Sequence, residues 1–288
     1  MDLASLRAIK LFCQKCNLQP KSWQGQNFLI DQKVLDKIIT VADLKKNDLI
    51  LEVGSGFGVF PQELAKRVKK VIAVEIDKNI VRVLRDILKN YKNVEIIEGN
   101  ILKIVPPKVD KIVANIPYSI TGNFLRRFLE AKSKPKEMIL LIQKEVAERI
   151  VAKPGEMSLL SVAVQFYSQP EIISYVSKKS FYPQPAVDSA IIKISQIGRR
   201  FNKDLSSEEI KDFFSLVRIG FSNRRKQLHN NLAVGLKIEN KKIGQKISGQ
   251  VKKILEDSNF NPKIRAQELC INDWLKLRKA LSLSAVQY

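Results

Sequence analysis

Short apolar runs alternate with helical segments through the first half of the chain, and this alternation constrains the fold more than any other feature. The runs lie within 48–60, 71–77, 93–100, 111–116 and 137–143. Helical periodicity precedes the first run and recurs between later ones, as at 31–44, 78–90 and 120–131. Apolar strands joined by helices pair in parallel and are buried on both faces. The sequence therefore predicts an α/β fold with a parallel sheet covered by helices.

The pattern changes in the second half of the chain. Apolar segments at 171–176 and 188–195 predict two more strands, paired as a hairpin at the edge of the sheet. A polar stretch at 196–210 then reads as a linker, and beyond it only helical periodicity is found. From residue 199 onward the chain has 19 Lys and Arg against 9 Asp and Glu, a net charge of +10. We therefore expect two domains, a catalytic domain at 1–198 and a small, basic all-α domain at 199–288.

Composition indicates the cellular location of the protein and the class of its binding partner. The chain has 288 residues, 45% of them hydrophobic, so a packed core is expected. No apolar run approaches the roughly 20 residues that span a bilayer, and the N-terminus lacks a secretory pattern. Three cysteines form no closed disulfide framework, which favours the reducing cytoplasm, and the lack of a spanning apolar run argues against a membrane. The net charge of +21 favours nucleic acid as partner over an acidic membrane surface or a merely solvated lysine-rich surface.

A glycine-rich loop follows the first predicted strand. The stretch LEVGSGFG places Gly54, Gly56 and Gly58 where the backbone can approach a ligand closely. Glu75 lies 21 residues after Gly54, at the tip of the second strand, where an acid can bond both hydroxyls of a ribose. The loop and the acid fit either NAD or S-adenosylmethionine, and they fit poorly with a glycine turn that serves only packing.

The fourth strand ends in Asn115-Ile116-Pro117-Tyr118, an unusual end for an apolar strand. An exocyclic adenine amine is a weak nucleophile, so a catalyst must orient it and offer hydrogen-bond acceptors as its nitrogen becomes tetrahedral. The Asn115 oxygen can accept, Pro117 stiffens the turn, and Tyr118 can stack on a base. An asparagine that only bonds its own backbone is the plain alternative. After the glycine loop and Glu75, the order of motifs favours methyl transfer.

These motifs resemble those of the ribosomal RNA adenine dimethyltransferases. GQNFLID (25–31), LEVGSGFG, AVEID, ANIPY, LLIQKEVAERI (140–150) and FYPQPAVDSA (181–190) occur in the order of that family. FYPQPAVDSA and GFSNRRKQLHNNL (220–232) are similar to the small-subunit, KsgA-type enzymes rather than to the macrolide-resistance methylases. The resemblance implies a Rossmann-like class I methyltransferase sheet and S-adenosylmethionine as cofactor. It also implies N6 of two adjacent adenosines in small-subunit rRNA, within a pre-ribosomal small subunit, as substrate.

The resemblance also implies roles for individual residues. Asn100 stands where the family usually has an aspartate that bonds the cofactor's adenine amine, and an asparagine oxygen can still accept. Phe181 matches an aromatic that sandwiches the target base opposite Tyr118, although from the residues alone it could equally be a core aromatic. The expected catalytic residues are Asn115, Tyr118 and Phe181. The expected cofactor-binding residues are Asn27, Leu29, Gly54, Gly56, Glu75, Asn100 and Asn115.

Two weaker patterns concern polar clusters. Arg224, Arg225 and Lys226 lie in SNRRKQLHNN (222–231), which fits RNA phosphate contacts better than a solvated helix face. CQKC (13–16) has zinc-like spacing, and His229 and Cys270 could complete four ligands. Structural zinc ligands come in two close pairs, however, and these last two lie far apart in the sequence. We expect free thiols and no metal.

Three functions remain in competition. The leading one is an S-adenosylmethionine-dependent rRNA adenine N6-dimethyltransferase, acting as a monomer. The second is a non-catalytic or dual-role RNA-binding assembly factor, or a transcription factor of the mitochondrial type, on the same fold. The third, an NAD-dependent oxidoreductase, is disfavoured by the glycine spacing and by the position of His229, the one histidine, in the basic domain.

Overall fold

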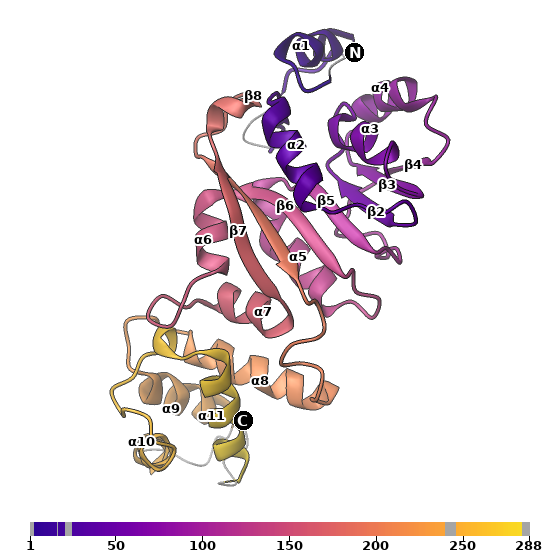
Figure 1. Ribbon diagram of the computed structural model, residues 1–288. Helices are drawn as coiled ribbons and strands as arrows, with labels where there is room; N and C mark the ends of the chain where they lie inside the picture. Colours follow the sequence, from indigo (N-terminus) through magenta and orange to yellow (C-terminus); the bar gives the residue numbers. More distant parts are fainter. Residues whose placement is uncertain (1–2, 16, 21–24, 240–245, 284–288) are drawn as a thin grey trace. The chain divides into compact units, whose positions relative to one another are not determined.

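The computed structural model describes residues 3–15, 17–20, 25–239 and 246–283 (Figure 1). Contacts between residues divide the chain into two compact units. The first comprises Met1–Glu148 and Ser168–Gly198, and the second comprises Arg149–Tyr167 and Arg199–Tyr288. Within the described ranges no helix is long and apolar enough to cross a membrane.

The first unit is built on a mixed sheet of seven strands. They are β2 (Leu49–Val53), β3 (Lys70–Glu75), β4 (Val94–Glu98), β5 (Lys111–Asn115), β6 (Glu137–Gln143), β7 (Gln169–Val176) and β9 (Ser189–Ser195). Their order is β4-β3-β2-β5-β6-β9-β7, with parallel pairs from β4 to β6 and antiparallel pairs at β9. The predicted α/β sheet and its antiparallel edge are confirmed.

Two helices of the first unit begin at aspartate caps. The helices of this unit are α1 (Leu6–Lys15), α2 (Gln32–Val41), α3 (Val59–Ala65), α4 (Lys78–Leu88), α5 (Thr121–Glu130) and the start of α6 (Lys144–Ile150). The Asp31 side chain caps α2 by accepting from two backbone amides, and the Asp77 side chain caps α4 by accepting from Asn79 N. The prediction of helices at 31–44, 78–90 and 120–131 is confirmed, whereas α1 was not predicted.

Both faces of the sheet are buried. Val113 and Ile139 belong to a core cluster with residues of α1, α2 and α3. Their strand neighbours Ile112 and Leu140, whose side chains point to the other face, are also fully buried. This explains why the central strands are apolar throughout. In β5 and β6, polar side chains are confined to the strand ends.

A second sheet, of only two short strands, was not predicted. Strand β1 (Phe28–Leu29) pairs antiparallel with β8 (Phe181–Tyr182), in the register Phe28 to Tyr182 and Leu29 to Phe181. Two residues are too few to show an alternating pattern in the sequence. The pairing joins the GQNFLID and FYPQPAVDSA motifs, which lie about 150 residues apart in the chain.

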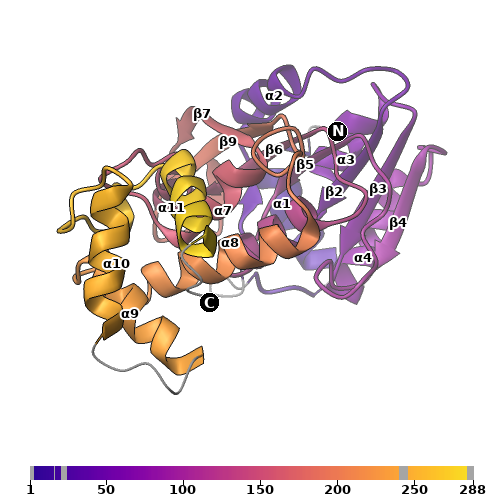
Figure 2. The same cartoon turned by 90° about the horizontal axis from the view of Figure 1, so that it is seen from below.

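The second unit is helical (Figure 2). Its helices are α7 (Leu159–Tyr167), α8 (Ser207–Gly220), α9 (Leu228–Glu239), α10 (Lys246–Asp257) and α11 (Ile271–Leu283). The division after Gly198 falls in the predicted polar linker. The sequence prediction places 149–167 in the first domain, however, and the structure packs this segment with the helices. An aromatic contact holds the segment there: the Phe166 ring of α7 stacks on the Phe213 ring of α8, with ring centroids 4.4 Å apart.

Candidate active site

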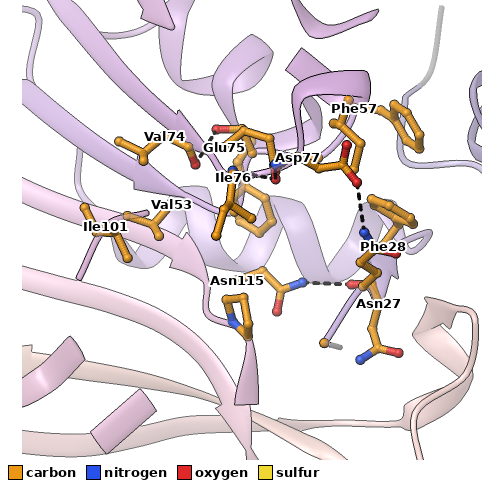
Figure 3. Close-up of a pocket in the computed structure, with 18 of the residues that line it drawn as sticks. Asn27, Phe28, Val53, Phe57, Val74, Glu75, Ile76, Asp77, Ile101 and Asn115 are labelled. Carbon is orange, nitrogen blue, oxygen red and sulfur yellow. Dashed lines mark hydrogen bonds between the residues drawn. The ribbon is translucent and has the colours of Figure 1, made fainter. Parts of the chain in front are cut away.

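The carboxyl ends of β2, β3 and β5 border a cavity of about 690 Å³ in the first unit (Figure 3). Open parallel sheets bind ligands at this edge. All of the predicted cofactor-binding residues line the cavity, namely Asn27, Leu29, Gly54, Gly56, Glu75, Asn100 and Asn115. Of the predicted catalytic residues, Asn115 lines it, and Tyr118 and Phe181 lie elsewhere in the described part of the unit.

Two glycines of the loop after β2 are required by its geometry. Gly54 and Gly56 have φ angles of 73° and 51°, in the left-handed region that glycine favours. A Cβ on Gly56 would lie 3.0 Å from the Phe28 ring, and one on Gly54 would lie 3.4 Å from the Asn115 carbonyl oxygen. The loop therefore brings bare backbone against both the N-terminal motif and the end of β5.

Glu75 ends β3 with its carboxylate directed at backbone amides. One oxygen accepts from Gly56 N at 2.9 Å, and the other accepts from Ile76 N at 2.8 Å and from Asp77 N at 3.0 Å. Burial raises the pKa of this carboxyl, and the three amide donors oppose that rise. Glu75 thus holds the glycine loop in place as well as facing the cavity.

A second acid lies beneath the loop. Glu52 of β2 is fully buried, and burial raises the pKa of its carboxyl to about 8. Ser55 Oγ donates to Glu52 Oε2, whereas Oε1 has no hydrogen-bond partner among the described residues. At neutral pH this side chain is therefore predominantly a neutral acid that anchors the loop. Its place before Gly54 was visible in the sequence, but its burial was not.

The Asn115 amide has a defined orientation. Its Nδ2 donates to the Asn27 carbonyl oxygen at 3.1 Å, as the dashed line in Figure 3 shows. A carbonyl oxygen can only accept, so the amide nitrogen must face Asn27 and the side-chain oxygen must face away from it. Asn115 therefore ends β5 with an acceptor available at the edge of the cavity.

Asn27 contributes a second acceptor. Its side chain is 7% exposed, and its Oδ1 is buried without a hydrogen-bond partner among the described residues. Leaving a buried acceptor unpaired is unfavourable, and such atoms are usually satisfied by a ligand or by water. Since Asn27 lines the cavity, this oxygen suits a ligand that donates a hydrogen bond.

Asn100 has one of its two side-chain heteroatoms already engaged. Its Oδ1 accepts from Leu102 N at 2.9 Å, which caps the turn after β4. An aspartate in the same pose would keep a second acceptor oxygen, whereas asparagine has an NH₂ donor there. A ligand amine would therefore have to share the oxygen that Leu102 uses. This is the physical consequence of the departure noted in the sequence.

Tyr118 begins the short turn η2 (Tyr118–Ile120) after Pro117. It is half-buried, and its hydroxyl lies 2.7 Å from Ser189 Oγ. Burial raises the pKa of the Tyr118 phenol, so the side chain is neutral at physiological pH.

The structure places Phe181 in the core of the first unit. Its side chain is 3% exposed and belongs to the core cluster of the first unit. In β8 successive side chains point to opposite faces, so Phe181 faces inward and Tyr182 is half-exposed. Phe181 therefore presents no free face to a base in this structure, and the alternative of a core aromatic describes its position.

Two apolar residues of the site, Ile76 and Ile101, were missed in the sequence. Ile76 lines the cavity and is 66% exposed, although it is apolar. Ile101 lines it from the loop after β4, and Gln26 Nε2 donates to Asp77 Oδ2 at 3.4 Å. An exposed isoleucine directly after Glu75 suits a planar apolar ligand surface. Neither isoleucine interrupts the apolar pattern, so the sequence does not distinguish Ile76 and Ile101 from core residues.

The basic run lies in a turn rather than on a helix. Arg224, Arg225 and Lys226 are all exposed between α8 and α9 of the second unit. Buried Asn231 secures this turn, because its Nδ2 donates to the carbonyl oxygens of Gly220 at 2.6 Å and Asn223 at 2.9 Å. These three residues therefore lie on no helix, and all three are exposed to solvent.

Cys13, Cys270 and His229 do not all belong to one unit. Cys13 is buried in α1 of the first unit, whereas Cys270 and His229 belong to the second, and Cys16 lies outside the described residues. The His229 ring nitrogen Nδ1 lies 2.9 Å from the Pro262 carbonyl oxygen. Over the described ranges, no group of three or more His, Cys, Asp and Glu side chains could hold a metal ion.

Solved structures of two methyltransferases have the same fold as this chain. The chain superposes on a dimethyladenosine transferase from Plasmodium falciparum with a TM-score of 0.75 at 30% identity, covering 88% of this chain and 97% of that one. It superposes on the 23S rRNA methyltransferase ErmE with a TM-score of 0.68 at 26% identity, covering 89% of this chain and 100% of that one. The predicted Rossmann-like methyltransferase fold is confirmed.

Sequence relatives agree with the fold. A protein of Dehalococcoides mccartyi named ribosomal RNA small subunit methyltransferase A is 43% identical over 266 residues, 90% of this chain and 88% of the relative. One of the same name from Clostridioides difficile is 36% identical over 291 residues, 97% of each. The family model described as ribosomal RNA adenine dimethylase matches residues 17–276. The resemblance found in the sequence is thereby confirmed, and the chain belongs to the ribosomal RNA adenine dimethylase family.

Proposed function

We propose that this protein transfers methyl groups from S-adenosylmethionine to N6 of two adjacent adenosines in small-subunit rRNA. The substrate is the rRNA within a pre-ribosomal small subunit, met in the cytoplasm by a monomer. One observation supports this most strongly: Asn115 directs an acceptor oxygen to the edge of the cavity while its amide is held by the Asn27 carbonyl. No feature of the described residues favours a non-catalytic role over this one.

The chemistry explains why such an acceptor is needed. Bound S-adenosylmethionine supplies a methyl group on a sulfonium cation. The adenine amine must turn its lone pair out of conjugation with the ring, and it then becomes positively charged and tetrahedral. The Asn115 oxygen can accept a hydrogen bond from the amine throughout this change. Asn115 thus stabilises the amine most where its charge develops, and it needs no strong base.

The cavity residues fit the proposed cofactor. Its ammonium, its ribose hydroxyls and its adenine amine are all donors, so the site needs acceptors. The Asn27 Oδ1 is a buried acceptor without a partner among the described residues, and Glu75 carries a carboxylate at the tip of β3. Gly54 and Gly56 line the cavity without side chains, so a ligand can approach the backbone there. A volume of about 690 Å³ lies within the usual range for ligand sites.

Cofactor choice can be tested directly by calorimetry. We expect the protein to bind S-adenosylmethionine and not NAD. Replacing Glu75 with alanine should weaken binding by about 1–3 kcal/mol, because it removes acceptors for the ribose and frees the glycine loop.

Glu98→Ala is the matched control for Glu75→Ala. Glu98 pairs with Glu75 across β3 and β4 but is exposed and lies outside the cavity lining. Its loss should leave the affinity unchanged. Tight binding of NAD without binding of S-adenosylmethionine would refute the cofactor assignment.

The exposed basic turn of the second unit is proposed to grip rRNA phosphates. Replacing Arg224, Arg225 and Lys226 together by alanine should weaken RNA binding. If each side chain contacts one phosphate, the slope of log affinity against log salt should fall by roughly two to three units. Filter binding or fluorescence anisotropy over a range of salt concentrations measures this slope.

Three other exposed lysines of the same unit provide the control. Removing Lys211, Lys252 and Lys253 takes away the same formal charge from α8 and α10. We expect a smaller change of slope in that variant. An equal change in both variants would mean that net charge, rather than the basic turn, carries the interaction.

The function itself is tested by incubating the protein with labelled S-adenosylmethionine and small-subunit rRNA that lacks the modification. Dimethyladenosine in a nuclease digest is the expected product. Methylation of large-subunit rRNA alone would refute the proposed substrate.

A further inference from the structure

Ser189 is a buried polar residue that the proposed reaction does not yet use. It opens β9, and none of its surface is exposed. It pairs with Gln143 of β6 on one side and with Val176 of β7 on the other. Backbone that is paired on both sides is rigid, so a group contacted by Ser189 is held firmly relative to the sheet.

That group is Tyr118. The two hydroxyl oxygens lie 2.7 Å apart, the usual length of an O–H···O hydrogen bond. Pro117 and the turn η2 hold the backbone end of the tyrosine, and Ser189 holds its hydroxyl end. The ring is therefore anchored at both ends.

The start of β9 is held in place by further hydrogen bonds. Asp188 Oδ1 accepts from Lys178 N at 2.9 Å, and the Asp188 carbonyl oxygen accepts from Lys144 N at 3.0 Å. These bonds connect the residue before Ser189 to the segments that follow β7 and β6. Ser189 Oγ cannot shift far without breaking backbone hydrogen bonds.

We infer that Ser189 is a positioning residue for methyl transfer, because it fixes the Tyr118 ring in the orientation that receives the target adenine. The inference rests on the proposed function. A ring that is already ordered loses less conformational freedom when a base stacks on it. Ser189 thereby gives the FYPQPAVDSA motif a part in the reaction.

The test is a double-mutant cycle on the rate of methyl transfer. Ser189→Ala and Tyr118→Phe should each lower kcat by roughly three- to tenfold, the effect of one hydrogen bond. The double variant should be no slower than either single variant, because both remove the same contact. The affinity for S-adenosylmethionine, measured by calorimetry, should stay within about twofold, since Tyr118 and Ser189 lie outside the cavity lining.

Two features keep the test decisive. Tyr118→Phe removes a single half-buried oxygen and should stay folded. It therefore tests the Tyr118–Ser189 hydrogen bond even if Ser189→Ala folds poorly. Ser195→Ala removes a hydroxyl from the far end of the same strand, where it donates to the Gln169 carbonyl oxygen at 3.2 Å, and it should leave kcat unchanged.

Two outcomes would overturn the inference. One is a normal kcat in Tyr118→Phe. The other is a double variant in which the two losses multiply, which would mean that the hydroxyls act independently. Transfer by the unchanged protein is measured in the same assay. Failure of that transfer would refute the proposed function itself, so the two failures are distinguishable.

Discussion

Replacing Asn115 with alanine is expected to slow methyl transfer by at least about a hundredfold while S-adenosylmethionine still binds. The side-chain oxygen is needed mainly as the amine becomes charged and tetrahedral, so its loss should lower the rate more than the affinity. Single-turnover kinetics with rRNA measures the rate, and calorimetry measures the affinity.

Asn115→Asp separates the two halves of the amide. The aspartate keeps an acceptor oxygen but loses the donor to the Asn27 carbonyl, which holds the side chain in place. Its rate should fall between those of the unchanged protein and Asn115→Ala. A normal rate in Asn115→Ala would show that the Asn115 oxygen does not stabilise the reacting amine.

Replacing Glu52 with glutamine is expected to make the protein more stable at alkaline pH and to change little near pH 5. Burial raises the pKa of Glu52 to about 8, from an ordinary value of 4.5. At a pH between these two pKa values, the folded state binds more protons than the unfolded state. The free energy of unfolding therefore falls as pH rises. The free energy of unfolding falls by at most about 1.4 kcal/mol per pH unit. The total loss between pH 5 and 8 is on the order of 4 kcal/mol.

Urea unfolding across that pH range measures the effect. Glutamine imitates the neutral acid, so Glu52→Gln should lose most of the slope and retain the acceptor for Ser55. Burial also raises the pKa of nearby Glu75, which leaves part of the pH dependence in the variant. Glu98→Gln, on an exposed side chain, should behave like the unchanged protein. Identical slopes in Glu52→Gln and the unchanged protein would mean that Glu52 is ionised in the fold.

Much of the site was predictable because parallel strands bring their carboxyl ends to one edge. Gly54, Glu75 and Asn115 each follow or end an apolar run, and the fold places them around one cavity. The apolar runs were readable because both faces of the sheet are buried. The antiparallel edge followed from two adjacent apolar segments near the end of the first domain.

What could not be predicted depends on contacts between distant segments. Strands of two residues have no readable period, so the inward orientation of Phe181 follows only from the pairing of β1 with β8. The segment 149–167 joins the helical unit through Phe166, without any change of composition to mark it. A local contact was also not predictable: Leu102 N donates to Asn100 Oδ1 in the turn after β4, and this bond limits Asn100 as an acceptor.

Mass spectrometry of small-subunit rRNA from cells that lack this protein tests the central claim most directly. We expect two adjacent adenosines to be unmethylated, to regain two methyl groups each when the unchanged gene is restored, and to remain unmethylated with Asn115→Ala. Full dimethylation in cells that lack the protein, or its restoration by Asn115→Ala, would contradict the account.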